Sequence, residues 1–171
     1  MFTMAKTVEV LVVAAGGGSG VGYSGGGGGG GCCTDTNSGG NGHGGNGGGI
    51  VFILASNFIL TGSIVSGGNN GLAGDISGGA PHNGSGGGGA GGSILIKTKV
   101  GTLGTNLITA PAGTGPAPVN DGGRGGNGGV GRIHLDYKDS YSGVTTPTID
   151  VTQDSKLDYP KSGGLFLQEF I

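Results

Sequence analysis

The glycine tracts constrain this chain more than any other feature of its sequence. Forty-eight of the 171 residues are glycine, many of them in uninterrupted runs such as 25–31 or in triplets such as GGRGGNGGV at 122–130. A glycine in a helix interior costs about 1 kcal/mol relative to alanine. Such runs cannot propagate a helix, so the sequence predicts a protein with essentially no α-helix.

One glycine motif resembles a dinucleotide-binding turn. Residues 20–25 read GVGYSG, which fits the pattern G-x-G-x-x-G. In that fold the next residues open a helix whose N-terminus holds the pyrophosphate. Here a run of glycines follows instead, and no acidic residue ends a second strand about twenty residues further on. We therefore do not interpret the motif as a nucleotide site, and no cofactor is expected.

Composition and charge exclude several classes of protein. The formal net charge is −2 and no basic cluster occurs, so nucleic-acid binding has no electrostatic basis. No stretch approaches eighteen apolar residues, so no membrane insertion is expected. With 6 prolines and without the strict Gly-X-Y period of collagen, a collagen triple helix is not expected. We interpret the N-terminus as mature protein, with a processed precursor as the alternative.

Apolar, β-branched runs follow the glycine tracts. They are rich in Ile and Val and are bounded by Gly, Asn and Ser, which is typical of strands; they lie at 7–15, at 50–61 with 64–65, at 93–100 with 107–108, and at 132–137. Residues 48–67 align with 91–110, and a third, degenerate copy starts near Gly131. The sequence thus predicts repeats of about 40 residues.

The glycine tracts themselves have a rhythm of three. Ordering them would cost on the order of 50–100 kcal/mol, and only backbone hydrogen bonds between neighbouring segments could offset that. A polyproline-II-type helix has three residues per turn, so G-G-X triplets leave two bare edges along which backbones can pack. We therefore predict a mainly β or irregular fold in which short strands alternate with packed polyglycine-II helices. The X residues Asn41, Asn46, Arg124 and Asn127 would lie on the surface, and the structural glycines would include Gly25, Gly28, Gly31, Gly44, Gly47, Gly86, Gly89, Gly122, Gly125 and Gly128.

These features resemble a known type of domain. The opening VEVLVVAAGGGSG at 8–20, followed by the run 25–31, is similar to the glycine-rich domains of bacteriophage tail and tail-fibre proteins. The alternation of glycine motifs with variable segments is similar to the tail-tip adhesins of T-even-like phages. The resemblance implies a rigid polyglycine-II body whose loops contact a host receptor. Residues 86–96 and 125–137 also look like repeats of large bacterial surface proteins.

The C-terminal part departs from the glycine pattern. We predict a glycine-rich repeat body at 1–140 and an extended strap or docking tail at 141–171. The tail ends in the apolar LFLQEFI at 165–171. Because a small glycine body covers large apolar side chains poorly, we expect contacts between copies of the chain at Ile50, Phe52, Leu54, Phe58, Leu165, Phe166 and Phe170.

No catalytic or metal motif is recognisable. Cys32 and Cys33 are adjacent and cannot form an unstrained disulfide with each other; a metal site, a bridge between subunits and free thiols stay open. His134 alternates with apolar residues and is expected on the solvent face of a strand, and Asp136 is expected at the surface. The loops 31–38, 68–83 and 109–121 either carry recognition or only turn the chain.

These observations favour a non-catalytic protein of a phage virion: a tail-fibre, tail-tip or decoration protein with a glycine lattice as display frame. The expected partners are copies of itself, other virion or surface proteins, and a host-surface receptor. The alternative is a structural subunit of an extracellular filament or surface layer.

Overall fold

The computed structural model describes residues 9–13, 42–74, 84–117 and 123–157. This part of the chain is mainly β and contains no helix, which confirms the prediction from the glycine tracts. No helix in it could therefore serve as a membrane span. The strands are β1 (Glu9–Val13), β2 (Ile50–Ile59), β3 (Ile64–Val65), β4 (Ser93–Thr109), β5 (Arg132–Thr146) and β6 (Asp150–Gln153).

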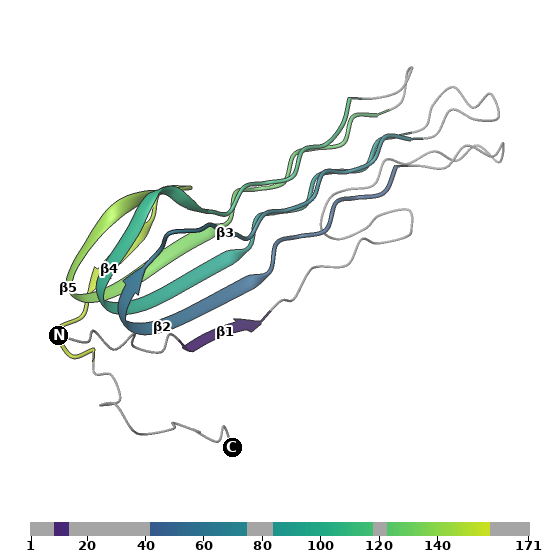
Figure 1. Cartoon of the computed structure of the whole chain (residues 1–171). Coiled ribbons are helices and arrows are strands. Elements are labelled where there is room, and N and C mark those ends of the chain that lie inside the picture. The colour runs from purple at the N-terminus through teal and green to yellow at the C-terminus, as the bar shows by residue number, and fades with distance from the viewer. Residues whose placement is uncertain (1–8, 14–41, 75–83, 118–122, 158–171) are drawn as a thin grey trace.

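All of these strands belong to one sheet (Figure 1) with the order β1-β2-β4-β5-β6, and β3 also pairs with β4. The pair β1–β2 is antiparallel, whereas β2–β4, β3–β4, β4–β5 and β5–β6 are parallel. Ile50 pairs with Ser93 and Ile59 with Thr102. Each residue of β2 thus lies beside the residue 43 positions further on, which is the spacing at which the two sequence segments align.

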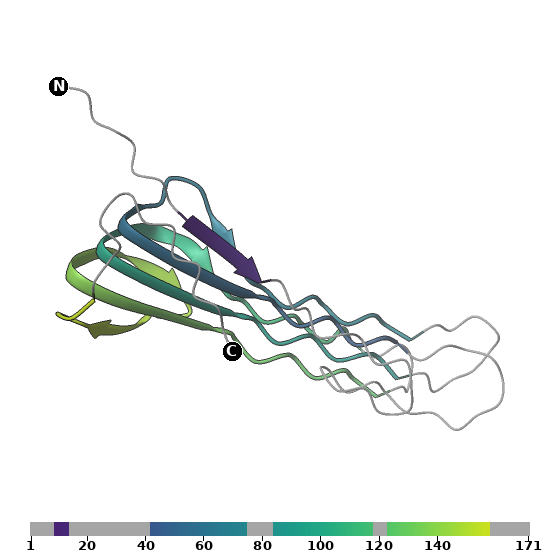
Figure 2. The ribbon, with the colours of Figure 1, turned by 90° about the horizontal axis from the view of Figure 1, so that it is seen from below.

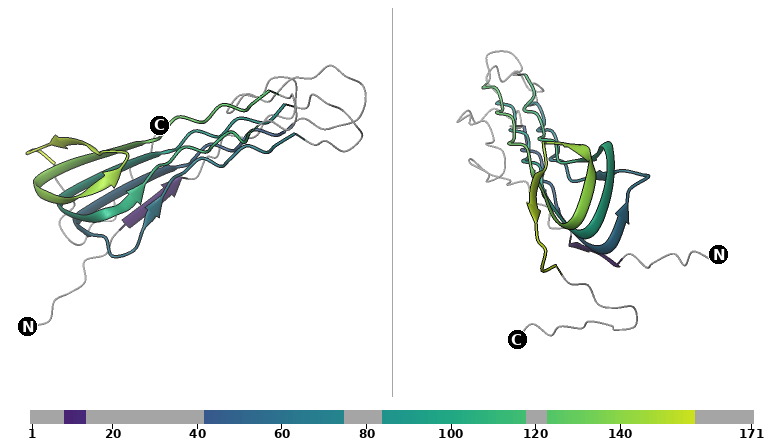
Figure 3. Two further views of the ribbon diagram at one scale, coloured as in Figure 1. Left: turned by 90° about the horizontal axis from the view of Figure 1, so that it is seen from above. Right: turned by 90° about the vertical axis from the view of Figure 1, so that its left-hand side faces the viewer.

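The long strands fold back on themselves. β4 and β5 run away from the glycine tracts, bend at the far end of the sheet and return (Figures 1 and 3). The register of the β4–β5 pair shifts at three places along this path. Such shifts are typical of β-bulges, which bend the strand that contains them. Gly104 and Gly143 have φ values of 73° and 112°, which side chains rarely adopt. Glycine at these positions therefore allows the return path.

The hydrophobic core lies inside the bend. Along the first part of β4, Ile94, Ile96 and Thr98 are buried and the residues between them are half-buried. Leu103 and Ile108 come from the returning part of the same strand and are fully buried. Ala110, directly after β4, and residues of β2 and β5 complete the cluster: Ile53, Ala55, Phe58, Ile133 and Leu135. One strand thus contributes to both walls of the core.

Five extended glycine-rich tracts, counted within the described residues, continue from the sheet. Tract 1 (42–49), tract 3 (84–92) and tract 5 (123–131) lead into β2, β4 and β5, and we call them outgoing tracts. Tract 2 (66–74) follows β3 and tract 4 (110–117) follows β4, and we call them return tracts. The tracts lie side by side and extend from one end of the sheet (Figures 1 and 2).

The strand bounds differ from the predicted ones where the chain bends. The runs 93–100 and 107–108 belong to one continuous strand, and β5 extends past 137 and past the expected boundary at residue 140. Residues 138–143 are mostly polar and largely exposed, so no apolar pattern marks them as strand. β6 was not predicted, because its four side chains are exposed and it is held by backbone pairing with β5.

Candidate functional site

The outgoing tracts are joined by backbone hydrogen bonds at every third residue. From tract 1 to tract 3, Gly42, Gly45 and Gly48 donate to the carbonyls of Gly84, Gly87 and Ala90 at 2.9, 2.8 and 2.7 Å. The same row continues from tract 3 to tract 5, where the donors are Ser85, Gly88 and Gly91 and the acceptors are Gly123, Gly126 and Gly129, at 2.8–2.9 Å. The three-residue period of the sequence is therefore also the period of the bonds between tracts.

The return tracts are bonded to the outgoing ones as well. Asn69 and Leu72 of tract 2 donate to Asn46 and His43 of tract 1, both at 2.8 Å. Tract 3 then donates to tract 2 through three residues, Gly86, Gly89 and Gly92. Tract 4 also bonds to tract 3, because Gly113 of tract 4 donates to the carbonyl of Gly89 at 2.8 Å. Tract 3 thus bonds to all four of the other described tracts.

Side chains are excluded from most of the contacts between tracts. A Cβ added to any of four predicted structural glycines would lie less than 3.0 Å from a neighbouring backbone atom; these are Gly86, Gly89, Gly125 and Gly128. Real Cβ atoms essentially never come so close. By contrast, nothing lies within 4 Å of the Cβ position on Gly123, Gly126 and Gly129. Tract 5 therefore has one packed edge and one open edge.

The remaining predicted tract residues are partly described. Gly44 and Gly47 are half-buried in tract 1, while Gly25, Gly28, Gly31 and Gly122 lie outside the described residues. Asn46, Arg124 and Asn127 are exposed, and Asn41 is not described. The side chain of Asn127 has a bond that the sequence did not indicate: its Oδ1 accepts the N–H of Gly115 in tract 4 at 3.0 Å.

The expected contact residues occupy different environments. Ile50 is 49% exposed, and Phe52 and Leu54 are half-buried on the face of β2 opposite the core. Phe58 is only 5% exposed and packs in the core cluster. Its assignment as a contact between copies was wrong, because the bend of the sheet covers it within one chain. Leu165, Phe166 and Phe170 lie outside the described residues.

Two of the expected loops are not loops where they are described. Residues 68–74 belong to tract 2 and residues 110–117 to tract 4, and both segments bond to their neighbours. Added Cβ atoms on Gly68, Gly71, Gly113 and Gly115 would meet backbone atoms, so close packing fixes these segments. Residues 75–83, 118–122 and the loop 31–38 with Cys32 and Cys33 lie outside the described residues.

A row of charged side chains crosses the outer face of the sheet from β4 to β6. Lys97 Nζ lies 2.7 Å from Asp136 Oδ2, and His134 Nε2 lies 2.9 Å from Asp136 Oδ1. The other ring nitrogen, Nδ1, lies 2.8 Å from Oδ2 of Asp150, the residue that pairs with His134 across the strands. The side chains of His134 and Asp136 are 33% and 15% exposed, so His134 is on the solvent side as expected, while Asp136 is more enclosed than expected.

This arrangement shifts the pKa values of His134 and Asp136 in opposite directions. Burial lowers the pKa of His134, but the hydrogen bonds and charges of Asp136 and Asp150 outweigh it, and the net pKa lies above 6.5. Burial raises the pKa of Asp136, but Lys97 and His134 outweigh it, and the net pKa lies below 3.8. Both ring nitrogens face carboxylate oxygens, so the doubly protonated ring satisfies both contacts. Chemically, the row is an ion-pair network that ties edge strand β6 to β5.

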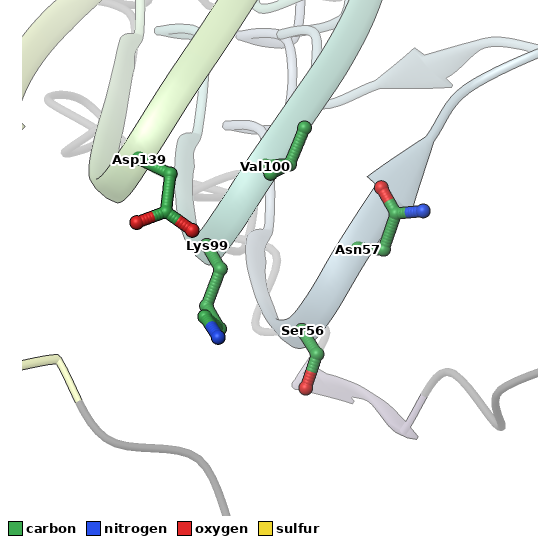
Figure 4. Close-up of a pocket in the computed structure, with 5 residues that line it drawn as sticks. All are labelled: Ser56, Asn57, Lys99, Val100 and Asp139. Atoms are coloured by element: carbon green, nitrogen blue, oxygen red, sulfur yellow. The ribbon is translucent and has the colours of Figure 1, made fainter.

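A shallow hollow lies at the bend of the sheet (Figure 4). It has a volume of about 250 Å³ and is lined by Ser56, Asn57, Lys99, Val100 and Asp139. These residues come from β2, β4 and β5 at the same level of the sheet, since Asn57 pairs with Val100. The hollow is open and offers no convergent set of catalytic groups. In the described part of the chain, no three His, Cys, Asp or Glu residues are placed to hold a metal ion.

Comparison with protein families, with curated proteins and with solved structures finds no match to this chain.

Proposed function

We propose that this chain is a non-catalytic structural protein in which polyglycine-II helices form a rigid frame. The observation that carries the proposal is the row of backbone bonds at every third residue, from Gly45 to Gly87 and from Gly88 to Gly126. Three residues per turn is the period of the polyproline-II-type helix. Packed glycine edges, on which an added Cβ would meet backbone, are what a polyglycine-II array requires.

Such an array is suited to display rather than to catalysis. Its segments are joined laterally by main-chain bonds, and the register of β2 against β4 keeps neighbouring 43-residue units aligned. We read these units as structural repeats: the first two consist of an outgoing tract, a strand path that bends and a return tract, and the third consists of an outgoing tract and a bent strand. A stiff repeat array of this kind can present exposed residues at fixed positions.

We further propose that the frame belongs to a phage virion, as a tail-fibre, tail-tip or decoration protein that binds a host surface. The resemblance of the glycine motifs to phage tail adhesins supports this assignment. The test is immunogold electron microscopy, with antibodies against the purified chain, on phage particles released from cells that carry its gene. Gold on tails or capsids is expected. Particles that lack the label and lack the chain by mass spectrometry would contradict the assignment.

A second function, a subunit of an extracellular filament or surface layer, is favoured by one observation. Several large apolar side chains are exposed on the sheet, among them Ile50, Ile59 and Val65. Exposed apolar surface can join successive copies. The same antibodies would then label filaments or cell surfaces in the absence of phage, and the purified chain would form open assemblies rather than closed ones.

A further inference from the structure

The donors that join the outgoing tracts define equivalent positions in the three tracts. Gly42, Gly45 and Gly48 of tract 1 donate to residues 84, 87 and 90 of tract 3. The residues directly after those acceptors, Ser85, Gly88 and Gly91, donate in turn to residues 123, 126 and 129 of tract 5. By the same step, the equivalent positions of tract 5 are those that follow its acceptors: Arg124, Asn127 and Val130.

In the first two units this position faces the return tract of the same unit. A Cβ on Gly45 would meet the carbonyl of Asn69 in tract 2, and a Cβ on Gly88 would meet the carbonyl of Gly113 in tract 4. Among these positions in tracts 1 and 3, only Ser85 has a side chain. It is buried, and its Oγ donates to the carbonyl of Ala117 at 3.0 Å. The presence of a return tract therefore limits the side chains at this position.

Among the described residues, no return tract follows β5 in the third unit. β5 ends at Thr146, and the chain turns into β6, which pairs with the first part of β5. Tract 2 donates to tract 4 through Gly68 and Gly71, which bond to the carbonyls of Pro111 and Thr114. On the far side of tract 4, Ala110 donates at 2.8 Å to Thr146, the last residue of β5. Further along tract 4, the N–H of Gly115 is bonded to the side chain of Asn127 instead of to a main-chain carbonyl.

We propose that Arg124, Asn127 and Val130 form a cap that ends the glycine lattice. Their side chains stand where a third return tract would pack. The side chain of Asn127 accepts the N–H of Gly115, in place of a main-chain carbonyl of that third return tract. The cap excludes a glycine tract of a second copy of this chain, because the bare edges and three-residue period of such a tract match those of the return tracts. This inference rests on the proposed polyglycine-II lattice.

The first experiment removes the cap with the triple variant R124G/N127G/V130G and measures its mass against concentration by light scattering and sedimentation. We expect the variant to associate at concentrations where the wild-type chain keeps its mass, because an open lattice edge becomes available. The matched control replaces three exposed residues of the sheet region, T61G/S63G/S142G, and should keep the wild-type mass. A triple variant with wild-type circular dichroism and wild-type mass throughout would overturn the proposal.

The second experiment does not depend on the triple variant folding. In Asn127→Ala, the amide of Gly115 should exchange with solvent about tenfold faster than in the wild type, as expected for one lost hydrogen bond. The amide of Gly113, which is bonded to Gly89, should keep its rate. An unchanged rate at Gly115 would overturn the cap. Protection of Gly45 and Gly88 in the wild type reports on the lattice itself, so a failure of the cap alone is distinguishable from a failure of the proposed function.

Discussion

The carbonyl oxygen of Gly113 occupies the space that a side chain on Gly88 would need. Gly88 also donates its N–H to Gly126 at 2.8 Å, yet nothing lies within 4 Å of the Cβ position on Gly126. Two glycines that share one hydrogen bond therefore differ in their tolerance of a side chain. This difference separates a packing requirement from a mere compositional bias toward glycine.

We predict that Gly88→Ala destabilises the chain whereas Gly126→Ala does not. The new methyl group at Gly88 meets fixed backbone, and overpacking of this kind costs about 1–3 kcal/mol or more. At Gly126 the methyl group meets no atom, so the change should be neutral or should stabilise by up to about 1 kcal/mol through the unfolded state. Urea unfolding of the two variants measures both effects. Equal free energies of unfolding for the two would contradict the packing requirement.

Stability should depend on pH through the charged row. The folded-state pKa of His134 is raised, so its contribution is fully present below about pH 6.5 and is lost as the pH rises through the raised value. The folded-state pKa of Asp136 is lowered, so its contribution is present above about pH 4 and is lost as the pH falls through the lowered value. The row contributes most between these limits.

The measurement for this prediction is the free energy of unfolding of the wild type and of His134→Gln between pH 5 and pH 9. The free energy of unfolding of the wild type should exceed that of the variant by less as the pH rises, because the neutral ring has one N–H for two carboxylates. Protection of the β6 amides should fall over the same range. An advantage that stays constant or grows with pH would show that the imidazolium is not what holds β6.

Phe58 and Ile50 should respond differently to substitution. Phe58 is buried in the core, so Phe58→Ala should lower the free energy of unfolding by about 3–5 kcal/mol. Ile50 is about half exposed, so Ile50→Ser should cost less and should weaken association if this end of β2 joins copies of the chain. Denaturation and sedimentation of each variant test the pair. A stable Phe58→Ala chain with altered mass would reinstate Phe58 as a contact between copies.

The sequence predicted the parts of the fold that have a periodic pattern. Apolar alternation located Ile94 and Ile96 in a strand. The structure adds that Ile50 lies beside Ser93, at the same offset of 43 residues that relates the two aligned segments. The sequence did not predict the bend. Residues at the bend, such as Lys99 and Asp139, are polar, so no apolar pattern marks the strands there, although their backbone pairing continues. The burial of Phe58 depends on that bend and could not be seen from the strand alone.

The candidate site was predicted less completely for a similar reason. The alternation of RIHLDY placed His134 and Asp136 on one face of a strand, and that signal could have suggested a charged row. Asp150 belongs to a strand without an apolar pattern, so nothing in the sequence brought it to His134. The triplet GGN at 125–127 predicted an exposed Asn127, whereas its bond to Gly115 depends on the path of a tract twelve residues earlier.

Amide hydrogen exchange, resolved residue by residue by NMR, tests the central claim most directly. The lattice predicts protection in a pattern of three: within tract 5, Gly128 and Gly131, which donate to tract 4, should exchange slowly, whereas Gly126 and Gly129 on the open edge should exchange fast. Tract 1 should likewise be protected at Gly42, Gly45 and Gly48. Fast and uniform exchange along these tracts would contradict a lattice of laterally bonded backbones, and with it the proposed role as a rigid frame.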